Sequence, residues 1–191
     1  LQDLHAQILA TIPDMTLNSG AYDGSMASFL EECKGAGALD SCCSSSVCSI
    51  EWLLDYIREQ RLNGDGRKVT KTVYSERVFT FGAGGPIKSV GTYLIPVQIG
   101  GRKAWIKIDV VPKPVRIPLL LSIKFLEGAK IRVDHGTRRY SWPDGARIST
   151  FKSRVGHVCI RLRTKMTEEE ENEKKKRWKD QVRARKKGTP I

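Results

Sequence analysis

The sequence predicts a mostly β protein in which short strands form a small antiparallel barrel or sandwich. Lys107 and Asp109 alternate with the apolar residues of the segment 103–111, which is typical of a half-buried strand. Turn residues separate this segment from similar ones; the pair Gly100-Gly101, for example, has the length typical of a β-hairpin turn. Short strands with turns at such spacing favour a barrel or a sandwich. The segments expected as strands are 76–81, 92–99, 103–111, 129–135, 146–151 and 157–163.

One or two short helices are expected beside these strands. Leu53 and Ile57 recur at helical spacing, so the segment 49–62 is predicted to present one apolar face. Ser49 is suited to be its N-cap, and the run NGDG that follows is suited to end it. A shorter helix is expected within 116–126, where a fully apolar strand breaks.

The pattern along the chain divides it into three parts. Residues 1–25 are expected to be an extension or linker with a short helical piece, and residues 26–163 to be the globular domain. Residues 164–191 form a charged tail in which Thr167 and Glu170 have the spacing of a capping box. The tail is therefore predicted to be a charged, solvated C-terminal helix that acts as a linker, with contact to RNA as the alternative.

Composition and charge are those of an ordinary globular protein. Hydrophobic residues make up 40% of the 191 residues, and no apolar run has the length of a membrane-spanning helix. The opening residues lack the features of a signal peptide, so an intracellular protein without membrane contact is expected. The net charge of +12 favours either weak, salt-sensitive contact with nucleic acid through the basic tail or general solubility.

The five cysteines are expected to be reduced thiols that hold no metal. Cys42 and Cys43 are adjacent, whereas a zinc site usually shows a spaced pair answered by a distant second pair. Small buried thiols are the favoured interpretation, and no cofactor is expected. A thiol enzyme that pairs one of these cysteines with His135 or His157 is an alternative, but nothing in the sequence places either histidine beside the cluster.

Three stretches occur in a characteristic order along the domain. They are LDSCCSSSVCSIEWLL from residue 39, FTFGAGGPIKSVGTYLIPVQIGG from residue 79 and VVPKPVRIPLLLSIKFLEGAKIRVD from residue 110. In this order they resemble the retropepsin-like aspartic peptidases of retroviruses and retrotransposons, and they look closest to those of invertebrate retroelements. The resemblance covers residues 26–163 and implies a small closed antiparallel β-barrel of the retropepsin, or acid protease, type.

The resemblance also implies an aspartic endopeptidase in which Asp40 is catalytic. Such an enzyme holds a water between two carboxylates that share one proton, and this chain offers one Asp-Ser motif of that kind. A homodimer with one Asp40 from each subunit is therefore implied. Ser41 would hydrogen-bond across the dimer and support the pair. The peptide or polyprotein substrate would lie under a flap whose tip is formed by Phe81, Gly82, Ala83, Gly84 and Gly85.

Two positions depart from the family pattern. Cys42 stands where the family has glycine, and its side chain is expected to crowd the Asp pair or to force a strained backbone. Ser122 likewise replaces a frequent glycine. Two functions therefore remain open. One is an active peptidase that processes a retroelement polyprotein in a cytoplasmic retroelement particle. The other is a catalytically silent module that dimerises or binds peptides, with weak RNA contact through the tail.

Overall fold

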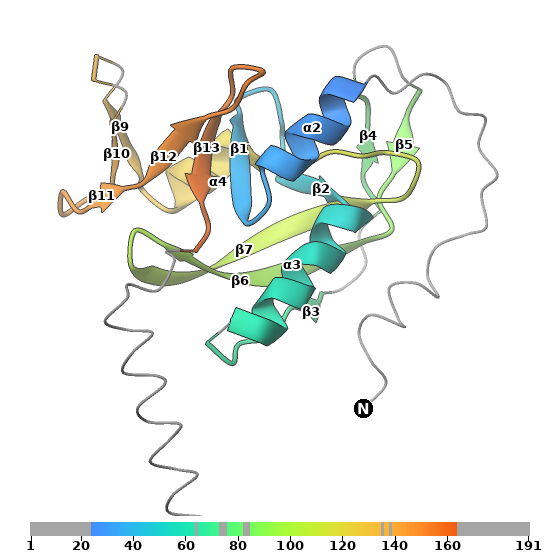
Figure 1. The fold of residues 1–191 in the computed structure, drawn as a ribbon, viewed down its shortest axis with the longest axis horizontal. Helices are drawn as coiled ribbons and strands as arrows, with labels where there is room; N and C mark the ends of the chain where they lie inside the picture. The colour runs from blue at the N-terminus through green and yellow to red at the C-terminus, as the bar shows by residue number, and fades with distance from the viewer. Residues whose placement is uncertain are drawn as a thin grey trace, which may run out of the picture.

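The computed structural model describes residues 24–63, 65–72, 76–81, 85–134, 136–137 and 139–163. The fold is mostly β, with helices that are few (Figure 1), as the sequence predicted. The helices are α2 (Gly24–Glu32), α3 (Ile50–Asn63) and α4 (Ile123–Gly128). The strands are β1 (Ala36–Asp40), β2 (Val47–Ser49), β3 (Thr70–Lys71), β4 (Val78–Phe79), β5 (Ile87–Lys88), β6 (Gly91–Ile99), β7 (Arg102–Val111), β8 (Leu119–Ser122), β9 (Arg132–Asp134), β10 (Arg139–Ser141), β11 (Arg147–Ile148), β12 (Thr150–Lys152) and β13 (Val158–Arg161).

Most strands belong to one eight-stranded sheet with the order β12-β13-β1-β8-β2-β7-β6-β3. Two of its pairs are parallel, β1 with β8 and β2 with β7, so the expectation of a purely antiparallel arrangement is wrong. The physical reason is that β1 and β2 each pair with a strand more than sixty residues further along, and such pairings need no hairpin between the partners. In the described residues β12 and β3 lie at the two ends of this order, and closure into a barrel stays a prediction.

The long hairpin β6–β7 belongs to this sheet. Its turn is the predicted Gly100-Gly101 pair. Both glycines have positive φ, 53° and 78°, as the tight two-residue turn requires. Gly100 is also confined by its surroundings, because a Cβ there would lie 2.9 Å from the carbonyl oxygen of Arg147. The turn packs under the β10–β11 segment, where Trp142 donates its indole N–H to the Ile99 carbonyl.

Helix α3 covers one face of this hairpin, as Figure 1 shows. It begins directly after Ser49, whose hydroxyl accepts the N–H of Trp52 at 3.4 Å, so the predicted helix and its N-cap are confirmed. Within the helix Trp52 and Tyr56 are stacked, with ring centroids 5.0 Å apart. Tyr56 also donates its hydroxyl to the carbonyl of Pro96 in β6 at 2.6 Å, which joins the helix to the hairpin.

The helices among the described residues are few, as expected, and α3 has 14 residues. Helix α4 follows β8 as predicted. Helix α2 was missed because its first residues, Gly24 and Ser25, have the composition of a loop. Packing of its last turn overrides that local preference, since Phe29 and Leu30 are buried.

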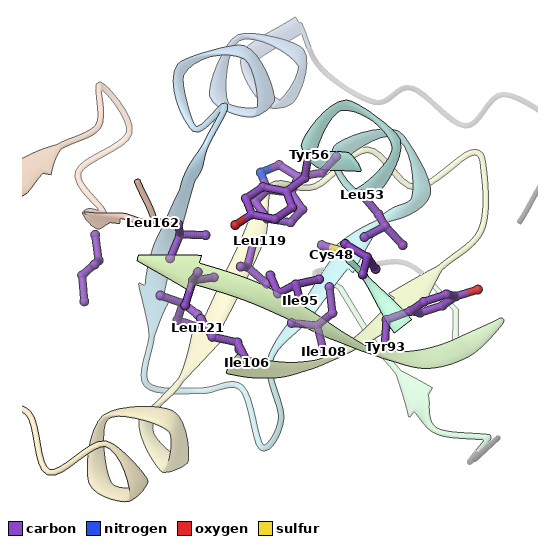
Figure 2. Packing of buried hydrophobic residues seen from close by; sticks show 14 of the residues in the cluster. Cys48, Leu53, Tyr56, Tyr93, Ile95, Ile106, Ile108, Leu119, Leu121 and Leu162 are labelled. Atoms are coloured by element: carbon purple, nitrogen blue, oxygen red, sulfur yellow. The ribbon is translucent and has the colours of Figure 1, made fainter. Parts of the chain in front are cut away.

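The hydrophobic core has two parts. The larger part fills the space between α3 and the β6–β7 hairpin, where Leu53 and Tyr56 face Ile95 and Ile108 (Figure 2). The smaller part lies around β1 and β8 and includes Ala38. The side chains of the hairpin β4–β5 that pack against this smaller part are Phe79, Phe81 and Ile87. The β4–β5 hairpin therefore packs against the part of the core to which β1, the strand that ends in Asp40, contributes.

Several expectations concern residues outside those that the structure describes. They are the short helical piece within 1–25, the charged helix of the tail 164–191, the flap residues Gly82, Ala83 and Gly84, and His135. Among the helices that are described, none is long and apolar enough to cross a membrane.

Candidate active site

Asp40 lies at the last residue of β1, directly opposite Ser122, the last residue of the parallel strand β8. Strands β1 and β8 pack tightly where Gly37 of β1 meets the side chain of Leu121 in β8. At Gly37 a Cβ would lie 2.6 Å from Cδ1 of the buried Leu121, so no larger residue fits without a shift. The side chain of Asp40 is half-buried at the end of β1.

The carboxylate of Asp40 accepts hydrogen bonds from the turn that follows it. The backbone N–H of Cys42 donates to Oδ1 at 2.9 Å, and the thiol of Cys43 donates to Oδ2 at 3.3 Å. The turn itself is closed by the N–H of Cys43, which donates to the Asp40 carbonyl at 3.3 Å. Both carboxylate oxygens are thus oriented by residues within three positions in sequence.

Cys42, where a glycine was expected, does not force a strained backbone. Lys130 is the only non-glycine residue with positive φ among the residues described, so Cys42 has an ordinary backbone conformation. Its side chain is exposed rather than buried, which corrects the expectation of a small buried thiol. In the single chain the sulfur therefore has space.

Cys43 is the residue that the sequence analysis missed, because the cysteine cluster was expected to be buried and chemically silent. Burial, the hydrogen bond to Asp40 and the charge of that carboxylate together raise the pKa of its thiol to about 12, with burial the largest cause. The thiol is therefore neutral and able to donate its proton to Oδ2. The position three residues after a candidate catalytic Asp is the only signal that could have identified it.

Ser122 is accommodated in place of glycine by Ser46, which lies directly before β2. Its N–H donates to the hydroxyl of Ser46 at 3.1 Å, and the two hydroxyl oxygens lie 3.4 Å apart. Both side chains are buried. This pairing satisfies the polar groups that the extra side chain brings into the sheet.

Asp109 occupies an unexpected position in β7. Alternation with Lys107 predicted a half-buried strand with polar residues on one face, and Lys107 is indeed exposed, but Asp109 is 2% exposed. Its Oδ1 accepts the Thr92 hydroxyl at 2.6 Å. Its Oδ2 accepts the Ser45 hydroxyl at 2.9 Å and lies 3.4 Å from Nη1 of Arg77. The correction has a physical reason: a carboxylate can be buried when hydroxyl donors and a cation surround it.

The hairpin β4–β5 is the segment in which a flap was expected. Phe81 is half-buried and stacks on Phe79, with ring centroids 6.0 Å apart, and Gly85 is exposed. At its base, Arg77 and Ser89 are joined twice: the Ser89 N–H donates to the Arg77 carbonyl, and the Arg77 N–H donates to the Ser89 hydroxyl. The structure therefore connects the base of the hairpin to Asp109 through Arg77.

Two other candidate residues, Ser41 and His157, are among those that the structure describes. Ser41 is exposed next to Asp40, where a second subunit could reach it. His157 stacks on Phe29, with ring centroids 5.3 Å apart, and its carbonyl accepts the thiol of Cys159 at 3.8 Å. The described residues contain no group of three or more potential metal ligands.

Comparison with known proteins found little similarity at the level of sequence. No family model matches the chain, and no curated protein matches it. Among solved structures, it is similar to the retroviral protease-like domain of Ddi1 from Leishmania major, with 15% sequence identity and a TM-score of 0.39. The similarity covers 58% of this chain and 78% of that one.

Proposed function

We propose that the chain is one half of an aspartic endopeptidase that acts as a homodimer, with one Asp40 contributed by each subunit. The observation that supports this most is the environment of Asp40. It is the last residue of the interior strand β1, and the Cys42 N–H and the Cys43 thiol orient its two carboxylate oxygens. Preorganised donors on a partly accessible carboxylate are what a general acid or base requires.

Two such carboxylates facing each other would hold a water molecule between them. Because two close negative charges repel, one proton is shared, and the pair titrates as a unit. The ionised Asp40 takes a proton from the water, which attacks the peptide carbonyl, and the protonated Asp40 gives its proton toward the amide nitrogen as the bond breaks. The Cys42 N–H and the Cys43 thiol keep both carboxylates in the plane that this exchange needs.

The requirement for a second subunit follows from the other aspartates. In the part of the chain that the structure describes, each of them is engaged by a different partner. Asp55 pairs with Arg58, Asp65 with Arg67 and Lys103, Asp109 with Arg77, Asp134 with Thr137, and Asp144 with Arg102. A carboxylate held in this way is not free to share a proton with Asp40. Two-fold symmetry supplies the missing group from the same residue of a second copy.

The substrate class that fits is an extended peptide. The aromatic side chains Phe79 and Phe81 of the hairpin β4–β5 pack on the part of the core to which β1 contributes. A peptide between the hairpin and the sheet edge would be held by main-chain hydrogen bonds, with its side chains in alternate pockets. A polyprotein of a retroelement, processed within an intracellular particle, is the substrate that the motif order suggests.

A second candidate is a catalytically silent module that dimerises or binds peptides. The observation that favours it is the exposed side chain of Cys42, two residues after Asp40. A sulfur from each subunit could keep the two carboxylates too far apart to share a proton. Weak RNA contact through the basic tail would be compatible with either function.

The test uses the full chain and a peptide library at about pH 4 to 7. Cleavage by the dimer, lost in Asp40→Asn and retained in the control Asp134→Asn, is the expected result. Binding of peptides without cleavage in the natural protein, with cleavage gained in Cys42→Gly, would establish the silent module instead. A protein that stays monomeric at high concentration and neither binds nor cuts peptides would exclude both.

A further inference from the structure

We propose that Asp109 is a positioning residue of the candidate active site, which holds the base of the β4–β5 hairpin and the loop after Asp40 in one fixed arrangement. The consequence for peptide cleavage rests on the proposed function, but the coupling between the two segments does not. It follows from the contacts of one buried carboxylate.

The first step is the location of its partners. Ser45 lies five residues after Asp40, in the loop that leads from β1 to β2, and donates its hydroxyl to Oδ2. Arg77 lies immediately before β4 and approaches the same oxygen with Nη1. A backbone bond reinforces the first contact, because the Asp109 N–H donates to the Ser46 carbonyl at 2.9 Å. Oδ2 of Asp109 thus contacts both the loop after Asp40 and the base of the β4–β5 hairpin, the two segments that would flank a bound peptide.

The second step is the size of the polar network. Side chains that are both polar and buried are few in the described residues, and most of them belong to this one network. They extend from the strand next to Asp40 to the base of the hairpin. Ser122 pairs with Ser46, the Ser46 carbonyl accepts the Asp109 N–H, and Asp109 accepts the Thr92 hydroxyl. Ser89 is reached through Arg77, whose backbone N–H donates to the Ser89 hydroxyl and whose guanidinium lies beside Asp109. Because a buried polar group that loses its partner is costly, these contacts hold the segments that they join in one arrangement.

The third step is energetic. A buried carboxylate is strongly destabilised when its cationic partner is removed, because its charge remains without compensation. If the hairpin moved away from the sheet, Arg77 would leave Asp109 with hydroxyl donors alone. The hairpin is therefore restrained at its base by the pairing of Arg77 with Asp109, although Arg77 itself is 45% exposed. The same carboxylate loses an anchor if the loop that carries Ser45 moves.

The experiment measures hydrogen exchange by mass spectrometry and peptide affinity on the full chain. Asp109→Asn is expected to accelerate exchange in both segments, 76–90 and 41–46. Arg77→Met is expected to accelerate it chiefly in 76–90, and Arg77→Lys to restore most of the protection. Lys107→Met, which changes an exposed residue of the same strand, is the control and is expected to change neither.

The kinetic readout separates positioning from a purely structural role. Arg77→Met is expected to raise KM, or the dissociation constant of a bound peptide, about tenfold with kcat within about twofold, since the hairpin and not the carboxylate of Asp40 is displaced. Uniform acceleration across the sheet, or exchange unchanged in both segments, would overturn the proposal. If Asp109→Asn does not fold, the Arg77 variants and their rescue decide the result. Protection lost as described in a protein that cuts no peptide would leave this coupling standing while excluding the peptidase.

A different pair of side chains carries a second, independent inference. The sulfurs of Cys33 and Cys159 lie 3.6 Å apart, both are buried, and the residues are 126 positions apart in sequence. Cys33 follows α2 and Cys159 belongs to β13, opposite Ala38 of β1. Of the five cysteines, Cys48 is equally buried but is not paired with another thiol.

The geometry points to an oxidisable dithiol that forms a Cys33–Cys159 disulfide. With hydrogen peroxide as the oxidant, the Cys159 thiolate attacks one oxygen to give a sulfenic acid and release hydroxide. The Cys33 sulfur then displaces the second oxygen as water, so two thiols lose two hydrogens and the peroxide is reduced to two waters. The hydrogen bond from Cys33 lowers the pKa of Cys159, which favours Cys159 as the attacking sulfur. The bond would tie the end of α2 to β13.

The test treats the natural full chain with hydrogen peroxide and maps peptides without reduction. The expected product is a Cys33–Cys159 cross-link that raises the melting temperature by several degrees, because it closes a long loop of the unfolded chain. Cys33→Ser is expected to abolish both effects, whereas the control Cys48→Ser is expected to retain the cross-link. Persistence of both free thiols, or a cross-link between other cysteines, would overturn the inference.

Discussion

The thiol of Cys43 donates a hydrogen bond to Oδ2 of Asp40, with 3.3 Å between sulfur and oxygen. This contact makes Cys43 part of the candidate active site. In the sequence alone, a cysteine three residues after the Asp does not indicate a catalytic role. Together with the N–H of Cys42 on Oδ1, it determines the orientation of the carboxylate. The hydrogen bond between Cys43 and Asp40 has two testable consequences.

Removal of the thiol donor is expected to weaken peptide cleavage. Cys43→Ala leaves Oδ2 without its donor and is predicted to lower kcat/KM about fivefold, equivalent to ~1 kcal/mol, whereas Cys43→Ser keeps a hydroxyl donor and retains activity. Steady-state kinetics on one peptide at several pH values are the measurement. Equal activity in the Ala and Ser variants would show that the hydrogen bond has no role in catalysis.

Alkylation is expected to distinguish the two neighbouring cysteines. Cys42 is exposed, whereas Cys43 has a pKa raised to about 12 and is almost entirely un-ionised at pH 8, where only a thiolate reacts. Iodoacetamide at that pH is therefore predicted to label Cys42 well before Cys43, as read by peptide mass spectrometry over time. Labelling of Cys43 should increase only as the pH approaches its pKa. Equal rates at pH 8 would contradict the hydrogen-bonded, half-buried position.

The substitution Cys42→Gly is expected to increase cleavage with only a small loss of stability. Cys42 has no positive φ, so glycine relieves no strain there and the free energy of unfolding should fall by at most about 1 kcal/mol, the cost of added backbone freedom. Peptide turnover should rise because two sulfurs are removed from beside the carboxylate pair. Denaturant melts and turnover measured on the same preparations test both parts. A fall in turnover would assign the Cys42 side chain a supporting role in catalysis.

The close packing of β1 against β8 is expected to leave no space for a side chain at Gly37. In Gly37→Ala the new Cβ would lie 2.6 Å from Cδ1 of Leu121, which is itself enclosed by the core. A loss of about 1–3 kcal/mol in the free energy of unfolding is predicted, together with a shift of Asp40 relative to Ser122 and reduced activity. Gly128→Ala, where nothing lies within 4 Å of the added Cβ, is the matched control. Equal stability of the two variants in chemical denaturation would refute the tight packing.

The hydrogen bond between α3 and β6 is expected to contribute to stability. Tyr56 is buried and donates its hydroxyl to the Pro96 carbonyl, so Tyr56→Phe should lower the free energy of unfolding by about 1–2 kcal/mol. Tyr140→Phe, at a half-buried position with no hydroxyl contact of this kind, serves as the control. Urea unfolding followed by tryptophan fluorescence is the measurement, and an unchanged midpoint for Tyr56→Phe would contradict the contribution of this bond.

Local patterns in the sequence were sufficient for several elements. The spacing of Leu53 and Ile57 and the cap at Ser49 located α3, because an amphipathic helix depends on residues a few positions apart. Gly100-Gly101 located the turn of the β6–β7 hairpin for the same reason, since positive φ at both positions is a property of the pair itself. Motif order drew attention to Asp40, and the structure places it at the end of a strand.

Only the tertiary structure decided the contacts that join distant segments. Parallel pairing of β1 with β8 brings Asp40 to Ser122, and β2 brings the loop after Asp40 to β7, where Asp109 is buried rather than exposed. Alternation in one strand reports which residues share a face, but it cannot report what covers that face. The donor on Asp40 from Cys43, the pairing of Arg77 with Asp109 and the contact of Cys33 with Cys159 all depend on such pairings or on the exact path of a turn. The sequence by itself therefore determined several of the elements and the candidate Asp, because these depend on residues close in the chain, and packing between remote strands decided the surroundings in which that Asp would act.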